Sequence, residues 1–127
     1  MSVSECTVNL TLIDRLAPTI NEVNIIADSI ITITSSEGMY NNVGATGAVG
    51  TTHFRATVYQ NDGNASEATI INITNDNQGP LVGGEIIARI GFVTDLLPSG
   101  VEEMTISPAG PANPIYDSEN NQMPQNT

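Results

Sequence analysis

Apolar and polar residues alternate with a period of two along most of the chain, as they do in half-buried β-strands. Val8, Leu10 and Leu12, for example, alternate with Asn9 and Thr11. No segment repeats its apolar residues at the 3.6-residue period of an amphipathic helix. Together with turn residues, the pattern predicts strands at about residues 6–14, 20–26, 30–34, 52–59, 67–74, 85–94 and 101–107. Seven short strands separated by turns indicate an all-β sandwich.

A long connection interrupts the alternation after the third predicted strand. Residues 36–51 contain four glycines and no sustained period. Long ordered loops on a rigid scaffold often carry binding residues, so this segment is a candidate binding region. The chain length of 127 residues suits a single domain with a usable core.

The strongly negative charge of the chain excludes some classes of binding partner. Fourteen acidic residues face three arginines and no lysine, giving a formal net charge of −11. Such a surface repels nucleic acid, since phosphate binding needs clustered Lys or Arg. We therefore expect no nucleic-acid partner, and the absence of a run of about 20 apolar residues predicts no membrane insertion. Carboxylates attract cations and are ligands that calcium prefers, although they also keep a surface soluble.

Candidate catalytic chemistry is sparse. The single histidine, His53, falls on the outward phase of a predicted strand, and the single cysteine, Cys6, cannot form a disulfide within the chain. A zinc site would need three or four Cys or His ligands. The adjacent acids Glu102 and Glu103 point to opposite faces of a strand and cannot flank one bond. The sequence thus predicts no catalytic residues, no enzyme activity and no small-molecule substrate.

Four motifs occur in a recognisable order. They are Ala17-Pro18-Thr19, the Thr-rich segment 31–38 ending in Ser-Glu-Gly, the segment Pro80–Gly84, and Ile115-Tyr116-Asp117 followed by Asn120-Asn121. Over residues 14–123 the chain resembles the bacterial immunoglobulin-like repeats of large surface adhesins. Asn120-Asn121 departs from the Gly-Asn turn typical of those repeats. The resemblance implies an extracellular or cell-surface immunoglobulin-like β-sandwich that serves as a spacer or adhesive module.

The order of strands differs from that of the repeats. In the repeats a closing strand follows the Tyr-Asp motif, whereas here residues 7–14 carry a matching pattern at the front of the sequence. We therefore divide the chain into an N-terminal donor strand at residues 1–14, a linker at 15–18 and an immunoglobulin-like sandwich at 19–127.

The donor strand can fill its own sandwich or that of a neighbour. Self-insertion requires the four-residue linker to span roughly 20 to 30 Å, the length of the module. Four residues reach at most about 14 Å, so insertion into a neighbour is favoured. The resulting head-to-tail contact predicts a homopolymer, an extracellular filament or tubule, in which Val8, Leu10 and Leu12 are buried. A single adhesive or spacer repeat of a large surface adhesin remains the alternative.

Acidic residues are expected to gather where two modules meet, and a cation there would relieve their mutual repulsion. Calcium accepts six to eight oxygen ligands in irregular geometry. The candidate ligands are Asp14, Glu37, Asp76, Asp117, Glu119 and Asn121 at one pole, and Glu102 and Glu103 at the other. The alternative is that Asp117 caps its own turn and Glu37 bonds backbone amides of the long loop.

Overall fold

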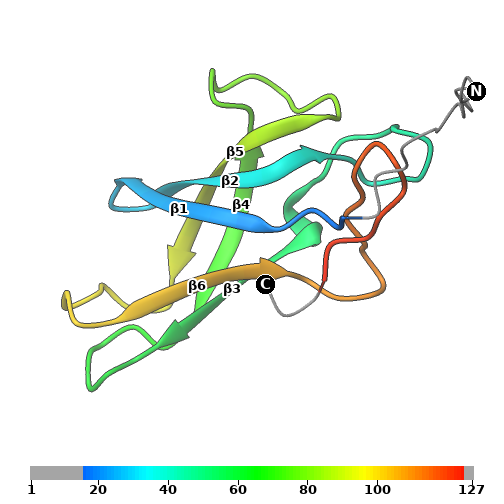
Figure 1. The fold of residues 1–127 in the computed structure, drawn as a ribbon. Helices are drawn as coiled ribbons and strands as arrows, with labels where there is room; N and C mark the ends of the chain where they lie inside the picture. The colour runs from blue at the N-terminus through cyan, green and yellow to red at the C-terminus, as the bar shows by residue number, and fades with distance from the viewer. Residues whose placement is uncertain (1–15, 125–127) are drawn as a thin grey trace, which may run out of the picture.

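Two antiparallel β-sheets make up the fold of the computed structural model, which describes residues 16–124 (Figure 1). The larger sheet has the strand order β1-β2-β5-β4, and the smaller sheet pairs β3 with β6. The strands are β1 (Ile20–Ala27), β2 (Ile30–Met39), β3 (Phe54–Tyr59), β4 (Ala68–Thr74), β5 (Glu85–Thr94) and β6 (Glu103–Pro108). A short 3-10 helix, η1 (Thr51–His53), precedes β3. No helix among the described residues is long and apolar enough to cross a membrane.

Six of the seven predicted strands fall within residues 16–124, and each is present. Two boundaries were wrong. The second strand of the sheet continues to Met39, where it pairs with Glu85, so the long connection is shorter than predicted. Residues Thr51–His53 form the 3-10 helix, so the next strand begins at Phe54. The predicted strand at 6–14 lies outside the described residues.

The core lies between the two sheets. Ile31, Ile33, Ala88 and Ile90 contribute from the inner face of the larger sheet, and Phe54 contributes from the smaller one. All five are buried. The alternation of these positions along their strands explains why period-two sequence patterns produce a two-layer arrangement.

Residues that follow β6 close one end of this core. Ile115 and Met123 are buried there. Tyr116 pairs with Tyr40 on one side and with Gln122 on the other. Asn120 adopts a left-handed conformation with φ of 68°, which asparagine tolerates better than most residues other than glycine.

The two ends of the sandwich carry different segments. At the start pole, the amide of Ser36 donates to Thr19 and the amide of Gly84 donates to Met39, which joins the start of β1, the end of β2 and the β4–β5 loop. At the turn pole lie the β1–β2 turn, the β3–β4 loop at 60–67 and the β5–β6 loop at 95–102. Every strand therefore runs from one of these poles to the other.

Candidate functional site

The two sides of the sandwich differ in how closely the sheets approach. Strands β3 and β4 are in contact along one side, and β1 and β6 have no comparable contact on the other. Within residues 16–124, the outer edges of β1 and β6 have no strand partner. Figure 1 shows these two strands bordering the same side of the molecule. An unpaired strand edge leaves backbone donors and acceptors available to another chain segment.

A groove of about 340 Å³ opens between these edges. Its walls come from β1 and β6, and its floor comes from β2, β3 and β5. Most of the side chains along it are apolar. They include Val23, Ile25, Ala27, Ile31, Val58, Phe92 and Met104. We call this feature the β1–β6 groove.

Two core-facing residues of β1 are exposed in the described part of the chain. Val23 lies opposite Ile33 and Ile25 lies opposite Ile31, so all four point to the inner face of the sheet. Ile31 and Ile33 are buried, with 1% and 0% of their surface exposed, whereas Val23 and Ile25 are 43% and 82% exposed. Side chains of this kind at inner positions are normally covered. As far as residues 16–124 are concerned, the core is therefore open along β1.

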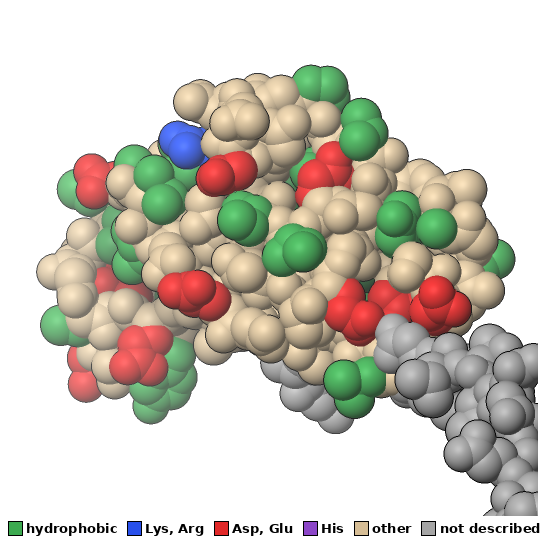
Figure 2. All heavy atoms as spheres, turned by 45° about the horizontal axis from the view of Figure 1, so that its top comes forward, with side chains coloured by type: hydrophobic (Ala, Val, Ile, Leu, Met, Phe, Trp, Pro, Cys, Tyr) green, Lys and Arg blue, Asp and Glu red, His purple; other side chains and the backbone are tan. Residues whose placement is uncertain are grey.

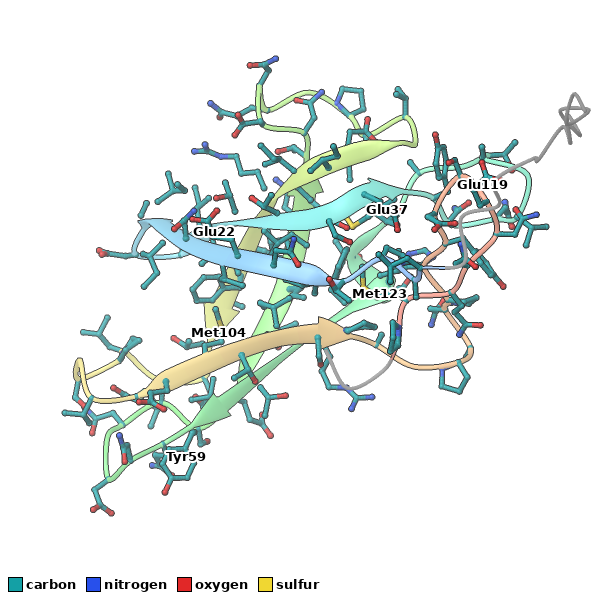
Figure 3. The ribbon with its side chains drawn as sticks, viewed as in Figure 1. Glu22, Glu37, Tyr59, Met104, Glu119 and Met123 are labelled. Carbon is teal, nitrogen blue, oxygen red and sulfur yellow. The ribbon has the colours of Figure 1, made fainter. Side chains whose placement is uncertain are left out.

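The smaller sheet shows a matching feature. Met104 of β6 lies opposite Val58 of β3, and both side chains are only partly buried. Figure 3 shows Met104 on the side of β6 that faces β1. Two residue pairs further along, Ile106 is buried at 6% exposure. The core is therefore covered toward the start pole, and the groove opens at the turn-pole end.

The groove is lined mainly by apolar side chains, and the inner residues of β1 repeat along it at the spacing of a strand. Alternate residues of a strand are about 6.6 Å apart, so inner positions on β1 repeat at the same interval as those of a strand laid beside it. Val8, Leu10 and Leu12 carry this spacing in the sequence. These three residues lie outside the described part of the chain.

Asp117 organises a turn at the start pole. Its Oδ1 accepts hydrogen bonds from the backbone amides of Glu119 at 2.9 Å and Asn121 at 2.8 Å, and its Oδ2 accepts one from the Asn121 side chain at 2.9 Å. Burial on its own raises the pKa of Asp117, but these hydrogen bonds and a contact with the Glu37 side chain outweigh it and lower the pKa. The carboxylate therefore caps its own turn. This is the role that the sequence analysis gave as the alternative to calcium binding.

Asp117 contacts three other predicted calcium ligands, the side chain of Glu37, the backbone amide of Glu119, and Asn121. Glu37 lies in β2, and Glu119 is exposed at the same pole in Figure 3. Asp76 is exposed in the turn that follows β4. No three His, Cys, Asp or Glu residues among those described lie where they could hold a metal ion. Asp14, which completes the predicted set, is outside the described residues.

Glu102 and Asp95 organise the turn pole. Glu102 accepts backbone hydrogen bonds from Asn64, Ala65, Ser99, Gly100 and Val101 at 2.8 to 3.1 Å. These bonds, with the Ala65 amide first, hold the pKa of Glu102 well below its usual range. Asp95 accepts hydrogen bonds from the Ser66 side chain and amide, which lower its pKa to about 2.

Glu103 is exposed and pairs with Tyr59 across the smaller sheet. The predicted ligands thus divide between the poles, with Glu37, Asp117 and Glu119 at one and Glu102 and Glu103 at the other. Calcium binding was predicted to involve both poles of neighbouring modules, and it stays a prediction. Figure 2 shows acidic side chains spread over the visible face with apolar side chains among them.

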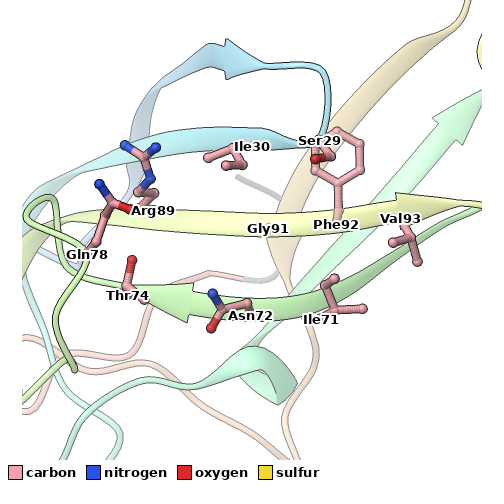
Figure 4. Close-up of a pocket in the computed structure, with 10 residues that line it drawn as sticks. All are labelled: Ser29, Ile30, Ile71, Asn72, Thr74, Gln78, Arg89, Gly91, Phe92 and Val93. Atoms are coloured by element: carbon pink, nitrogen blue, oxygen red, sulfur yellow. The ribbon is translucent and has the colours of Figure 1, made fainter.

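A second depression lies on the outer face of the larger sheet (Figure 4). It has a volume of about 330 Å³ and contains Arg89, Asn72 and Gln78. Its lining includes no carboxylate, Cys or His, so it offers hydrogen bonds without a group for acid or base chemistry. His53 has a local role, since its Nδ1 accepts the Gly50 amide at 2.9 Å, and partial burial lowers its pKa.

Sequence patterning did not identify Val23, Ile25 and Met104 as functional residues. Alternation shows that they face the core, but it does not show which neighbouring strand covers them. Comparison of the chain with protein-family models, with curated proteins and with solved structures found no match.

Proposed function

We propose that this protein is the structural subunit of an extracellular filament or tubule that polymerises head to tail by donor-strand complementation. Residues 7–13 of one copy occupy the β1–β6 groove of its neighbour. The observation that carries the proposal is the exposure of the core-facing residues Val23 and Ile25 beside the unpaired edge of β6. The extracellular location rests on the resemblance to surface adhesin repeats.

The strand order of residues 16–124 supports an immunoglobulin-like sandwich with one strand position unfilled by the described residues. Constant-type immunoglobulin domains place strands A, B, E and D in one sheet and C, F and G in the other. Numbered along this chain, β1-β2-β5-β4 corresponds to A-B-E-D, and β3-β6 corresponds to C-F. No strand of the described chain takes the position of strand G, beside β6. That position is where the groove opens.

Filling the groove buries apolar side chains of both copies, which stabilises the contact between them. Burying Val8, Leu10 and Leu12 contributes roughly 5 to 8 kcal/mol before the entropy of ordering the strand is subtracted. Val23, Ile25 and Met104 lose their exposure at the same time. Backbone hydrogen bonds to the edge of β6 fix the position of the donor strand along β6, as in other cases of strand addition to a sheet edge.

Strand direction decides between a neighbour's groove and the chain's own. In an antiparallel sheet the donor runs against β6, from the start pole toward the turn pole, so residue 13 ends at the turn pole. Leu16 lies at the start pole of its own module, next to the segment that leads into β1. The three steps from residue 13 to residue 16 reach at most about 11 Å, and an eight-residue strand such as β1 is about 23 Å long. An antiparallel donor therefore belongs in another copy.

Calcium forms part of the same proposal. A head-to-tail contact brings the start pole of one copy, with Glu37, Asp117 and Glu119, toward the turn pole of the next, with Glu102 and Glu103. Like charges at close range repel, and a divalent cation bound between the poles offsets this repulsion.

The proposal is tested by separating the donor segment from the groove. The full chain should form polymers visible by negative-stain electron microscopy. A variant lacking residues 1–13 should stay monomeric and bind a synthetic peptide of residues 5–14, and full-length Leu10→Asp should also fail to polymerise while remaining folded by circular dichroism.

Normal polymers from the truncated variant would refute the proposal. A full chain that stays monomeric under all assembly conditions would instead favour the alternative function, a spacer or adhesive repeat of a larger surface protein.

A further inference from the structure

Exposed leucines mark the loop at the turn pole. In the β5–β6 loop, Leu96 is 59% exposed and Leu97 is 85% exposed. The same loop is held in place by the hydrogen bonds to Asp95 and Glu102 described above. A loop that is already ordered and exposes large apolar side chains suits a binding surface, because little conformational entropy is lost when a partner binds it.

A depression lies beside these leucines. Its volume is about 360 Å³, and it extends from Asp28 and Ser29 in the β1–β2 turn to the loop residues Leu96, Leu97 and Pro98. Four residues line both this depression and the β1–β6 groove. They are Asp28, Phe92, Thr94 and Pro98. The depression is therefore continuous with the turn-pole end of the groove.

An apolar side chain with the right reach lies at the opposite pole of the chain. Leu16 is 74% exposed and follows the last residue of the donor segment, Ile13, by three positions. In the proposed assembly, an antiparallel donor strand leaves the groove at the turn pole of the accepting copy. Leu16 of the donating copy then lies within about 11 Å of that exit, which is where the depression begins.

We propose that Leu16 of one copy packs into the depression beside Leu96 and Leu97 of the next copy. This inference rests on the proposed function and adds a second contact to it, a junction between the start pole of one module and the turn pole of the next. The occupant is a second copy of this chain, because the linker between the donor strand and β1 delivers Leu16 to this place.

The junction also fixes the polarity of the assembly. A donor strand in the opposite direction, parallel to β6, would leave the groove at the start pole of the accepting copy. Leu16 would then meet the loop that contains Val43, and two copies could exchange strands and close as a dimer. Packing of Leu16 against Leu97 is compatible only with the antiparallel donor, so every subunit points the same way along an open polymer.

Paired cysteines test the junction. On a Cys6→Ser background, Leu16→Cys combined with Leu97→Cys should give a ladder of disulfide-linked oligomers on a non-reducing gel after oxidation of polymers. The matched control pairs Leu16→Cys with Val43→Cys, both at the start pole, and should give no ladder. Polymers that yield no Leu16–Leu97 product, or that yield the Leu16–Val43 product, would overturn the junction and leave the proposed function standing.

A second variant avoids dependence on cysteine geometry. Leu97→Asp should lower the apparent association constant for polymerisation about tenfold or more while the subunit stays folded, because a charge would be buried at the junction. Ile71→Asp, at a residue 59% exposed in β4 and away from the turn-pole loop, is the control and should assemble normally. Equal assembly of the two variants would refute the junction. Failure of the unmodified full chain to polymerise would refute the proposed function, and the junction with it.

Discussion

Adjacent isoleucines in β1 allow a direct test of the groove. Ile25 lines the β1–β6 groove, and Ile26, the next residue, does not. Ile25 is 82% exposed in the described chain, so Ile25→Ala should change the stability of the subunit by only a few tenths of a kcal/mol. In a polymer the same side chain lies beneath the donor strand, and its loss removes about 1 to 2 kcal/mol of apolar burial at each junction.

That loss corresponds to a decrease of roughly 5- to 30-fold in the association constant between subunits. Sedimentation of the full chain over a range of concentrations measures this constant, and thermal unfolding monitored by circular dichroism measures the stability of the subunit. Ile26→Ala is the matched control and should assemble like the unmodified chain. Equal assembly of Ile25→Ala and Ile26→Ala, or a large loss of subunit stability in Ile25→Ala, would show that Ile25 does not face a strand contributed by a neighbour.

The acidic residues and Cys6 provide four further predictions. Asp117→Ala removes the acceptor of three partly buried hydrogen bonds and should lower the free energy of unfolding by about 3 kcal/mol, measured by urea titration. Hydrogen bonding lowers the pKa values of Asp117, Asp95 and Glu102. The stabilisation that these carboxylates give the folded state should therefore be fully present above about pH 5 and be lost as the pH decreases from 4 toward 2. A chain equally stable at pH 2 and pH 7 would contradict this. Excess chelator should slow polymerisation, and millimolar calcium should restore it better than magnesium does; unchanged assembly would remove calcium from the proposal. Cys6→Ser should polymerise normally, since strand pairing already holds neighbours together.

Strand positions were the feature that the sequence predicted best. Ile and Val alternate with Thr and Asn, and this alternation placed β1, β4 and β5 to within one or two residues. The second strand was predicted too short because Ser35, Ser36 and Gly38 weaken the local pattern. Pairing with Thr19 and Glu85 nevertheless keeps the strand in the sheet to Met39. Long-range partners of this kind leave no local signal.

The groove was harder to predict, for a related reason. Alternation at Val23 and Ile25 reveals which face of β1 turns inward, but a period-two pattern does not identify the strand that lies above it. The open side follows from the strand order together with the contact between β3 and β4, which leaves the edges of β1 and β6 on the other side.

For the predicted calcium ligands, the sequence suggested a function where the structure shows a local structural role. Their sequence positions suggested cation binding, whereas the structure gives Asp117 and Glu102 backbone amides as partners within the chain. Turn-forming neighbours such as Ser99-Gly100 and Asn120-Asn121 were the available signal for that role.

Residue-to-residue contacts across the β1–β6 groove test the central claim most directly. Polymers are grown from a mixture of two batches of the full chain, one labelled with ¹³C and the other with ¹⁵N, and examined by solid-state NMR. The account predicts contacts between Leu10 and Ile25 or Met104 that join differently labelled copies, with residues 7–13 antiparallel to β6. Contacts of Leu10 that occur only within one copy, or the absence of any contact between residues 7–13 and β6, would contradict it.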